Sequence, residues 1–244
     1  MAIQIIDCEQ GTPEWFAARA GIPTASEFGT VMGEGRDGVL PSAIMDAMVK
    51  NGCTAAQLAA AVKAAKARGV NPTAARAKYL RQLAGEILTG EPAPEGYSNG
   101  FMERGKELED EARSLFAFMR DEEPIRVGFV RNGNAGCSPD SLLGDKAGLE
   151  IKVAIPAVQI DRLQRGTLPP EHVAQVQGSL WVTERETWSF VSYCPKLPPL
   201  ILTINRDEAY IAQLAKAVAT FNEELEALVA AIRTYENPRG RMAA

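Results

Sequence analysis

Two acidic residues and a lysine lie near one another in the middle of the chain. Asp140 ends the sequence Cys-Ser-Pro-Asp, and Glu150 and Lys152 lie in Gly-Leu-Glu-Ile-Lys. Glu150 and Lys152 are two apart in a strand-like segment, so their side chains share a face. A turn-like segment, 144–148, precedes them, and a hairpin there would bring Asp140 beside Glu150. Paired carboxylates repel unless a cation separates them, and oxygen ligands suit Mg²⁺ or Mn²⁺. The spacing indicates a metal-dependent phosphodiesterase; the alternative is a solvated strand face.

Two helices offer further polar groups to such a site. Glu109 lies at the border of the apolar stripe of a helix expected over 101–119, where a carboxylate could face a metal ion. The alternative is a solvated acidic face. Gln175 lies off the core stripe of a second helix, expected over 170–183. An amide can orient a water or a lysine without adding charge, whereas an ordinary surface glutamine is the alternative.

A third cluster near the N-terminus could bind an anion. Arg19 offers a fork of donors to phosphate, and hydroxyl residues Thr24 and Ser26 begin an expected helix whose backbone N–H groups favour negative charge. The alternative is a plain helix cap with a surface arginine. His172 is the single histidine. It has no serine or cysteine nucleophile with a partnering acid beside it, so a hydrogen-bonding or DNA-facing role is expected rather than catalysis.

The composition is that of a globular protein. The 244 residues are 46% hydrophobic and 23% charged. The net charge of -5 argues against loose, sequence-independent coating of DNA, although a basic groove and metal ions can coexist with an acidic exterior. The four cysteines form no C-x-x-C pair, which disfavours a zinc ribbon or an iron–sulfur cluster. We see no signal peptide or membrane-length apolar run, so we expect a cytoplasmic protein.

The order of expected elements predicts an α/β fold. A helical N-terminal half precedes strands at 126–131, 136–143 and 149–154, and two more strands follow the 170–183 helix, at 187–193 and 200–204. A long helix over 206–235 closes the chain. These elements predict a mixed central sheet flanked by helices. We expect one nuclease domain over 1–244, with an Ala-rich helical insertion at 50–72 and a flexible tail at 237–244.

The ordered motifs of the chain resemble the family of λ exonuclease and the YqaJ-like viral recombinase nucleases. The resemblance runs from about residue 11 to 212. Each motif is modest, but several in the same order and at compatible spacing are hard to obtain by chance. The matching residues are Trp15, Arg19, Gly21 and Thr24 to Ser26; Gly105, Glu109, Ala112, Arg113 and Phe116; Cys137 to Asp140; Gly148 to Lys152; Ala174 to Gln177; Trp181 to Thr183; and Trp188, Phe190, Tyr193 and Pro195.

The resemblance implies a restriction-endonuclease-like PD-(D/E)xK fold and a 5′→3′ exonuclease that leaves 3′ overhangs on linear double-stranded DNA. It implies that Asp140, Glu150 and the Ile151 carbonyl hold Mg²⁺ or Mn²⁺, two ions per site, with Glu109 at the second ion. It further implies that Lys152 orients or activates the attacking water. Gln175 would support that water and the lysine.

The resemblance also implies partners. Arg19, Ser26 and Thr24 would grip the 5′-phosphate of the cut strand. The family implies a ring-shaped homotrimer that threads DNA, a single-strand annealing protein as partner in recombination, and a phage or prophage origin in a bacterial cytoplasm. The chain departs from the family pattern at His172, where an aromatic is expected, and in the Ala-rich segment. The alternatives are an endonuclease or RecB-like nuclease of the same fold, and a DNA-end binding protein that does not cleave.

Overall fold

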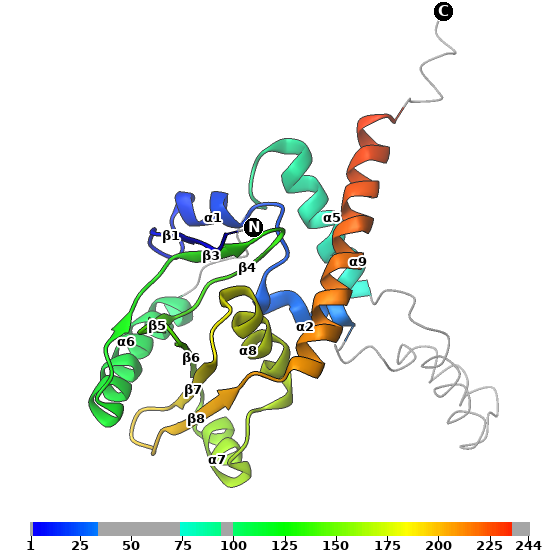
Figure 1. Cartoon of the computed structure of the whole chain (residues 1–244). Coiled ribbons are helices and arrows are strands. Elements are labelled where there is room, and N and C mark those ends of the chain that lie inside the picture. Colours follow the sequence, from blue (N-terminus) through cyan, green and yellow to red (C-terminus); the bar gives the residue numbers. More distant parts are fainter. Residues whose placement is uncertain (1, 34–73, 94–99, 236–244) are drawn as a thin grey trace, which may run out of the picture.

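The computed structural model describes residues 2–33, 74–93 and 100–235 (Figure 1). The Ala-rich segment 50–72 and the tail 237–244 lie outside the described residues. Two sheets form the centre of the molecule, with helices on both sides. Within the described residues, no helix combines the length and the hydrophobicity needed to cross a lipid bilayer.

The larger sheet has five strands in the order β2-β5-β6-β7-β8. β6 and β7 are parallel and every other neighbouring pair is antiparallel, so the sheet is mixed, as the sequence predicts. Two helices, α7 (Pro156–Arg165) and α8 (Pro170–Thr183), form the crossover between β6 and β7. The strands are β2 (Pro124–Ile125), β5 (Ser141–Leu143), β6 (Ala147–Val153), β7 (Thr187–Tyr193) and β8 (Leu200–Asn205).

Alternating side chains divide the two faces of this sheet between two helices. On β7, Trp188 and Phe190 pack towards α8 (Pro170–Thr183). Val191 and Tyr193 pack towards α6 (Gly100–Arg120), together with Leu149 and Ile151 of β6. Because successive side chains of a strand point to opposite faces, Glu150 and Lys152 lie on the α8 side. The sheet therefore delivers its two polar β6 residues to one helix.

The smaller sheet has the order β1-β3-β4. It contains β1 (Gln4–Ile6), β3 (Phe129–Asn132) and β4 (Ala135–Cys137). The prediction of one strand over 136–143 was wrong, because β4 and β5 belong to different sheets and residues 138–140 connect them. Pro139 lacks a backbone N–H and cannot continue a ladder. Asp140 therefore lies on a link between the sheets.

The N-terminal helices are short. α1 (Pro13–Arg19) is capped by Thr12, whose hydroxyl accepts from the Trp15 amide, and α2 spans Phe28–Met32. The turn at Ala25–Glu27 is a 3-10 helix, and Thr24 makes no side-chain cap there. The expectation that hydroxyls cap a regular helix at this point was therefore wrong.

Three longer helices complete the fold. α7 (Pro156–Arg165) is absent from the sequence prediction, although its signals are present: a proline begins it and Gly166, with φ 61, ends it. α5 (Ala74–Thr89) and α9 (Glu208–Arg233) run side by side away from the larger sheet (Figure 1). The ion pair of Arg76 with Glu224, 2.7 Å, joins them.

Candidate active site

Asp140 and Glu150 lie beside each other at the end of the β5–β6 pair. Ser141 pairs with Leu149 across this antiparallel ladder, so continuing the register by one residue brings Asp140 opposite Glu150. Asp140 Oδ2 accepts a hydrogen bond from the Ile151 amide at 2.5 Å. Glu150 is buried, with 2% of its surface exposed. The structure thus brings together the two carboxylates that the hairpin interpretation pairs.

Lys152 and Gln175 both contact the same oxygen of Glu150. Gln175 Nε2 donates to Glu150 Oε1 at 2.6 Å, and Lys152 Nζ lies 2.7 Å from that atom. Gln175 comes from α8, whose Val176 and Leu180 face the core. The amide therefore points away from the core stripe and into the carboxylate cluster.

The cluster has unbalanced negative charge. Burial raises the pKa of Asp140 well above its usual range, and the neighbouring Glu150 and Glu109 raise it further. Burial also raises the pKa of Glu150, against the opposing effects of Lys152 and Gln175. Burial lowers the pKa of Lys152, but the surrounding carboxylates, Glu150 first, raise it more, so the net direction is upward. Lys152 is a cation held among acids.

Glu109 is held by an arginine of its own helix. Arg113 Nη2 donates to Glu109 Oε1 at 2.5 Å, and its Nε donates to Ser141 Oγ at 3.0 Å. The same Nη2 is 3.4 Å from the Asp140 carbonyl oxygen. Arg113 therefore ties α6 to the start of β5. The sequence interpretation missed this contact, although an arginine four residues after Glu109 on a helix is a local signal.

The donor set fits a divalent cation. Among the described residues, no three His, Cys, Asp or Glu side chains come together as a ready metal cluster. Two neighbouring carboxylates, the buried Glu150 and the half-buried Asp140, are nevertheless the arrangement that a hard cation relieves, since oxygen donors suit Mg²⁺ and Mn²⁺. The raised pKa of Asp140, caused by burial and then by Glu150, reflects that unrelieved repulsion. Asp140 and Glu150 are the acidic pair able to hold such an ion.

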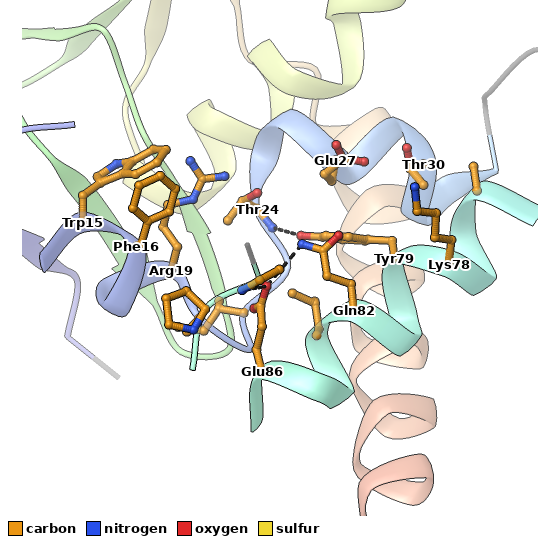
Figure 2. Close-up of a pocket in the computed structure, with 16 residues that line it drawn as sticks. Trp15, Phe16, Arg19, Thr24, Glu27, Thr30, Lys78, Tyr79, Gln82 and Glu86 are labelled. Atoms are coloured by element: carbon orange, nitrogen blue, oxygen red, sulfur yellow. Dashed lines mark hydrogen bonds between the residues drawn. The ribbon is translucent and has the colours of Figure 1, made fainter. Parts of the chain in front are cut away.

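A cavity of about 550 Å³ lies between α1, the 25–27 turn and α5 (Figure 2). Arg19 and Thr24 line it, and the Arg19 guanidinium stacks 3.9 Å from the Trp15 ring centre. Burial lowers the pKa of Arg19. Ser26 is exposed and is not a lining residue, but its hydroxyl is 3.2 Å from that of Thr24. The three expected phosphate-binding residues are thus grouped, with Ser26 at the edge.

The sequence interpretation missed the α5 wall of this cavity. Lys78, Tyr79, Gln82 and Glu86 line it opposite Arg19 (Figure 2). The Tyr79 hydroxyl accepts from the Thr24 amide at 3.2 Å, and burial raises the pKa of Tyr79 to about 12, so it stays neutral. Helical periodicity places Tyr79 in a core stripe and gives no sign that the adjacent polar residues share one cavity.

His172 has a structural partner. Its Nε2 lies 2.9 Å from Arg162 Nη2, and its ring packs against Phe190 at 5.3 Å. Burial, followed by the charges of Lys152 and Arg162, lowers the pKa of His172 to about 4. The imidazole is therefore neutral near pH 7 and accepts from the guanidinium. This contact agrees with the expected hydrogen-bonding role.

The mixed five-stranded sheet between α6 and α8 is the α/β arrangement expected of a restriction-endonuclease-like fold. Residues 47–186, more than half of the chain, match the family described as YqaJ-like viral recombinase domain. The chain belongs to this family.

Solved structures with the same fold agree with this assignment. The chain is 29% identical to an alkaline exonuclease, LHK-Exo, from Laribacter hongkongensis, with a TM-score of 0.69 over 91% of this chain and 96% of that one. LHK-Exo in complex with dAMP gives 30% identity and a TM-score of 0.70 over the same shares. A phage-related exonuclease from Haemophilus somnus 129PT shares the fold at 17% identity and a TM-score of 0.55, over 86% and 96% of the two chains.

A shorter relative matches part of the chain. The putative uncharacterized protein ExoD of Escherichia coli (strain K12) is 36% identical over 64 residues, which are 25% of this chain and 74% of that protein.

Proposed function

We propose that the protein is a metal-dependent 5′→3′ exonuclease that acts on linear double-stranded DNA and leaves 3′ single-stranded overhangs. The observation that carries the proposal is the grouping of Asp140, Glu150, Lys152 and Gln175 where the β5–β6 pairing ends. Similarity to an alkaline exonuclease, which has also been crystallised with dAMP, supports a DNA substrate.

Each residue of the cluster has a role in phosphodiester hydrolysis. Asp140, Glu150 and the Ile151 carbonyl would hold the divalent ions, with Glu109 as a further ligand. Two Mg²⁺ or Mn²⁺ ions, when bound, supply positive charge that stabilises the attacking and leaving oxygens. Lys152, whose Nζ lies 2.7 Å from Glu150 Oε1, would orient or activate the attacking water. Gln175 fixes the Glu150 oxygen that Lys152 also contacts.

The cavity beside Arg19 suits the 5′ end of the cut strand. A guanidinium is a strong donor to phosphate, and partial burial strengthens the attraction by excluding water. Thr24 and Ser26 add hydroxyl donors at one side of the cavity. We propose that these three residues bind the terminal phosphate.

We further propose that residues 1–244 form one nuclease domain and that the protein assembles as a ring-shaped homotrimer acting with a single-strand annealing protein. The net charge of -5 supports a topological hold on DNA, since attraction to phosphates alone is weak for an acidic protein. A ring around the duplex would replace part of that attraction.

The test uses linear duplex DNA with a 5′-phosphate on one strand only, labelled separately at each end of that strand, with Mg²⁺, and a closed circular duplex as control. We expect the 5′ label to be released first, the complementary strand to survive, and the circle to remain intact. Linearised circles would show an endonuclease. Binding of ends without nucleotide release by the wild-type protein would show a non-cleaving protein.

A second comparison tests the phosphate site. A 5′-phosphorylated duplex should be cut faster than a 5′-hydroxyl duplex, and Arg19→Gln should remove most of that preference. Equal rates for the two duplexes with the wild-type protein would take Arg19, Thr24 and Ser26 out of the site.

A further inference from the structure

The link that carries Asp140 is held by side chains from the N-terminal segment. Trp15 Nε1 donates to Ser138 Oγ and to the Gly128 carbonyl, each at 3.0 Å. Gln10 Nε2 donates to the Pro139 carbonyl at 2.9 Å and to the Val127 carbonyl at 3.1 Å. Ser138 and Pro139 are the two residues that precede Asp140. Ser138 and Pro139 lie between the two sheets and belong to neither. The bonds from Trp15 and Gln10 therefore help to fix the position of these two residues.

The same indole forms one wall of the cavity that contains Arg19. The Arg19 guanidinium lies over the Trp15 ring, 3.9 Å from its centre, while the ring N–H contacts the Asp140 link. Figure 2 shows Trp15 and Phe16 on the Arg19 side of the cavity, with Thr24 near the guanidinium. One rigid side chain with two rotatable bonds therefore touches both the anion-binding arginine and the segment that carries the catalytic carboxylate.

We propose that Trp15 is a positioning residue that sets the distance between the bound 5′-phosphate and the bond that is cut, so that cleavage falls at one fixed phosphodiester. The inference rests on the proposed function. A reacting group must approach within about 3–3.5 Å, and a misplacement of about 1 Å costs up to about 100-fold in rate. Trp15 acts as a spacer, because its ring contacts Arg19 and its N–H contacts Ser138. It would hold the neighbouring phosphodiesters, one nucleotide away, out of reach of the carboxylate cluster.

Two variants remove the hydrogen bond between Trp15 and Ser138, one from its donor and the other from its acceptor. Trp15→Phe keeps an aromatic ring under Arg19 and deletes the indole N–H. Ser138→Ala deletes the acceptor on the link and leaves the indole and its stacking unchanged. Trp181→Phe is the matched control, because Trp181 packs near Phe28 at 5.8 Å, away from the link. The 5′ label identifies the length of the first product released from a phosphorylated duplex.

We expect the wild-type protein and Trp181→Phe to release a first product of one length. Trp15→Phe and Ser138→Ala should each release a mixture of lengths, with a first-cut rate lower by up to about 100-fold. Both should keep the preference for a 5′-phosphate, because Arg19 remains. The two effects should be strongly non-additive in the double variant, because both changes remove the same hydrogen bond.

The outcomes separate this inference from the proposed function. If the wild-type protein releases no nucleotides, the proposed function fails and the spacer has no reaction to position. If the wild-type protein cuts and Ser138→Ala, folded by its Tm, yields the wild-type product length at the wild-type rate, the spacer role is overturned. Should Trp15→Phe fail to fold, Ser138→Ala alone decides. That change removes only the hydroxyl of a half-buried residue and leaves the packing of the Trp15 ring in place.

Discussion

Gln175 donates a hydrogen bond to Glu150 Oε1 at 2.6 Å and so joins α8 to β6 inside the carboxylate cluster. That oxygen is also the one that Lys152 contacts. An amide at this position fixes a carboxylate rotamer without adding charge, which is how groups behind a metal ligand support it.

We expect Gln175→Ala to lower kcat by about 10- to 100-fold while KM for duplex DNA changes little. Gln177→Ala is the matched control on the same helix, since Gln177 donates to the Asn205 carbonyl and accepts from the Asp207 amide, outside the carboxylate cluster. It should lower the Tm yet keep the wild-type rate per folded molecule. Steady-state digestion of labelled duplex measures both. A full wild-type rate in Gln175→Ala would remove this residue from the catalytic set.

Asp140→Asn should stabilise the protein and abolish cleavage. Burial and the neighbouring Glu150 raise the pKa of Asp140, so the ionised pair disfavours the folded state near pH 7. The amide removes one of the two charges, and about 1 kcal/mol of relief corresponds to a Tm rise of about 2–4 °C in a domain of this size. Thermal unfolding in EDTA measures the change.

The same measurement with Mg²⁺ tests metal binding directly. Ligands that bind the folded state raise its Tm, so Mg²⁺ should raise the Tm of the wild-type protein and raise that of Asp140→Asn much less. An equal shift in both proteins would contradict the assignment of Asp140 as a ligand.

His172 should make stability depend on pH. Its folded pKa of about 4, lowered first by burial, lies below the usual 6.5. The unfolded chain therefore takes up the proton first, and stability contributed by the neutral imidazole is lost as the pH falls from about 6.5 towards 4. As the pH falls over this range, the Tm of the wild type should fall more than the Tm of His172→Phe, because phenylalanine does not titrate. A constant difference would show that His172 does not titrate in this way.

Gly148→Ala should destabilise the protein. A Cβ at Gly148 would lie 2.3 Å from an atom of the buried Trp188 ring. Overpacking a core typically costs about 1–3 kcal/mol. Gly85→Ala in α5 is the control, because an added Cβ meets nothing within 4 Å and alanine favours helix. Urea unfolding should show a lower midpoint for Gly148→Ala and an unchanged or higher one for Gly85→Ala; equal midpoints would mean that the Trp188 ring moves aside freely.

Strand alternation was enough to predict part of the candidate site. Glu150 and Lys152 share a face because they are two apart in a strand, and the hairpin register brings Asp140 next to them. Helix α8 has the predicted bounds, Pro170–Thr183, because a proline begins it and a core stripe follows. These features depend on local periodicity and turn residues, which a sequence carries directly.

Other features depend on contacts between distant residues. Pro139 is a local signal that a strand ends near Ser138, but the bonds that hold the link come from Gln10 and Trp15, more than 120 residues earlier, and no local pattern predicts them. Likewise, Arg113 is visible as a helical partner of Glu109, but its bond to Ser141 appears only once α6 packs on the sheet. The cavity wall of Lys78 and Gln82 forms only where α5 meets α1.

The position of Asp140 on a link between two sheets has a pharmacological consequence. The Asp140 carboxylate is half-buried and lies beside other acidic groups, which makes it a difficult target for a small molecule. The cavity of about 550 Å³ beside Trp15 is of ordinary drug-binding size. A compound that displaced the Trp15 indole would loosen the Ser138 end of the link, and so would act on the proposed site without contacting its carboxylates.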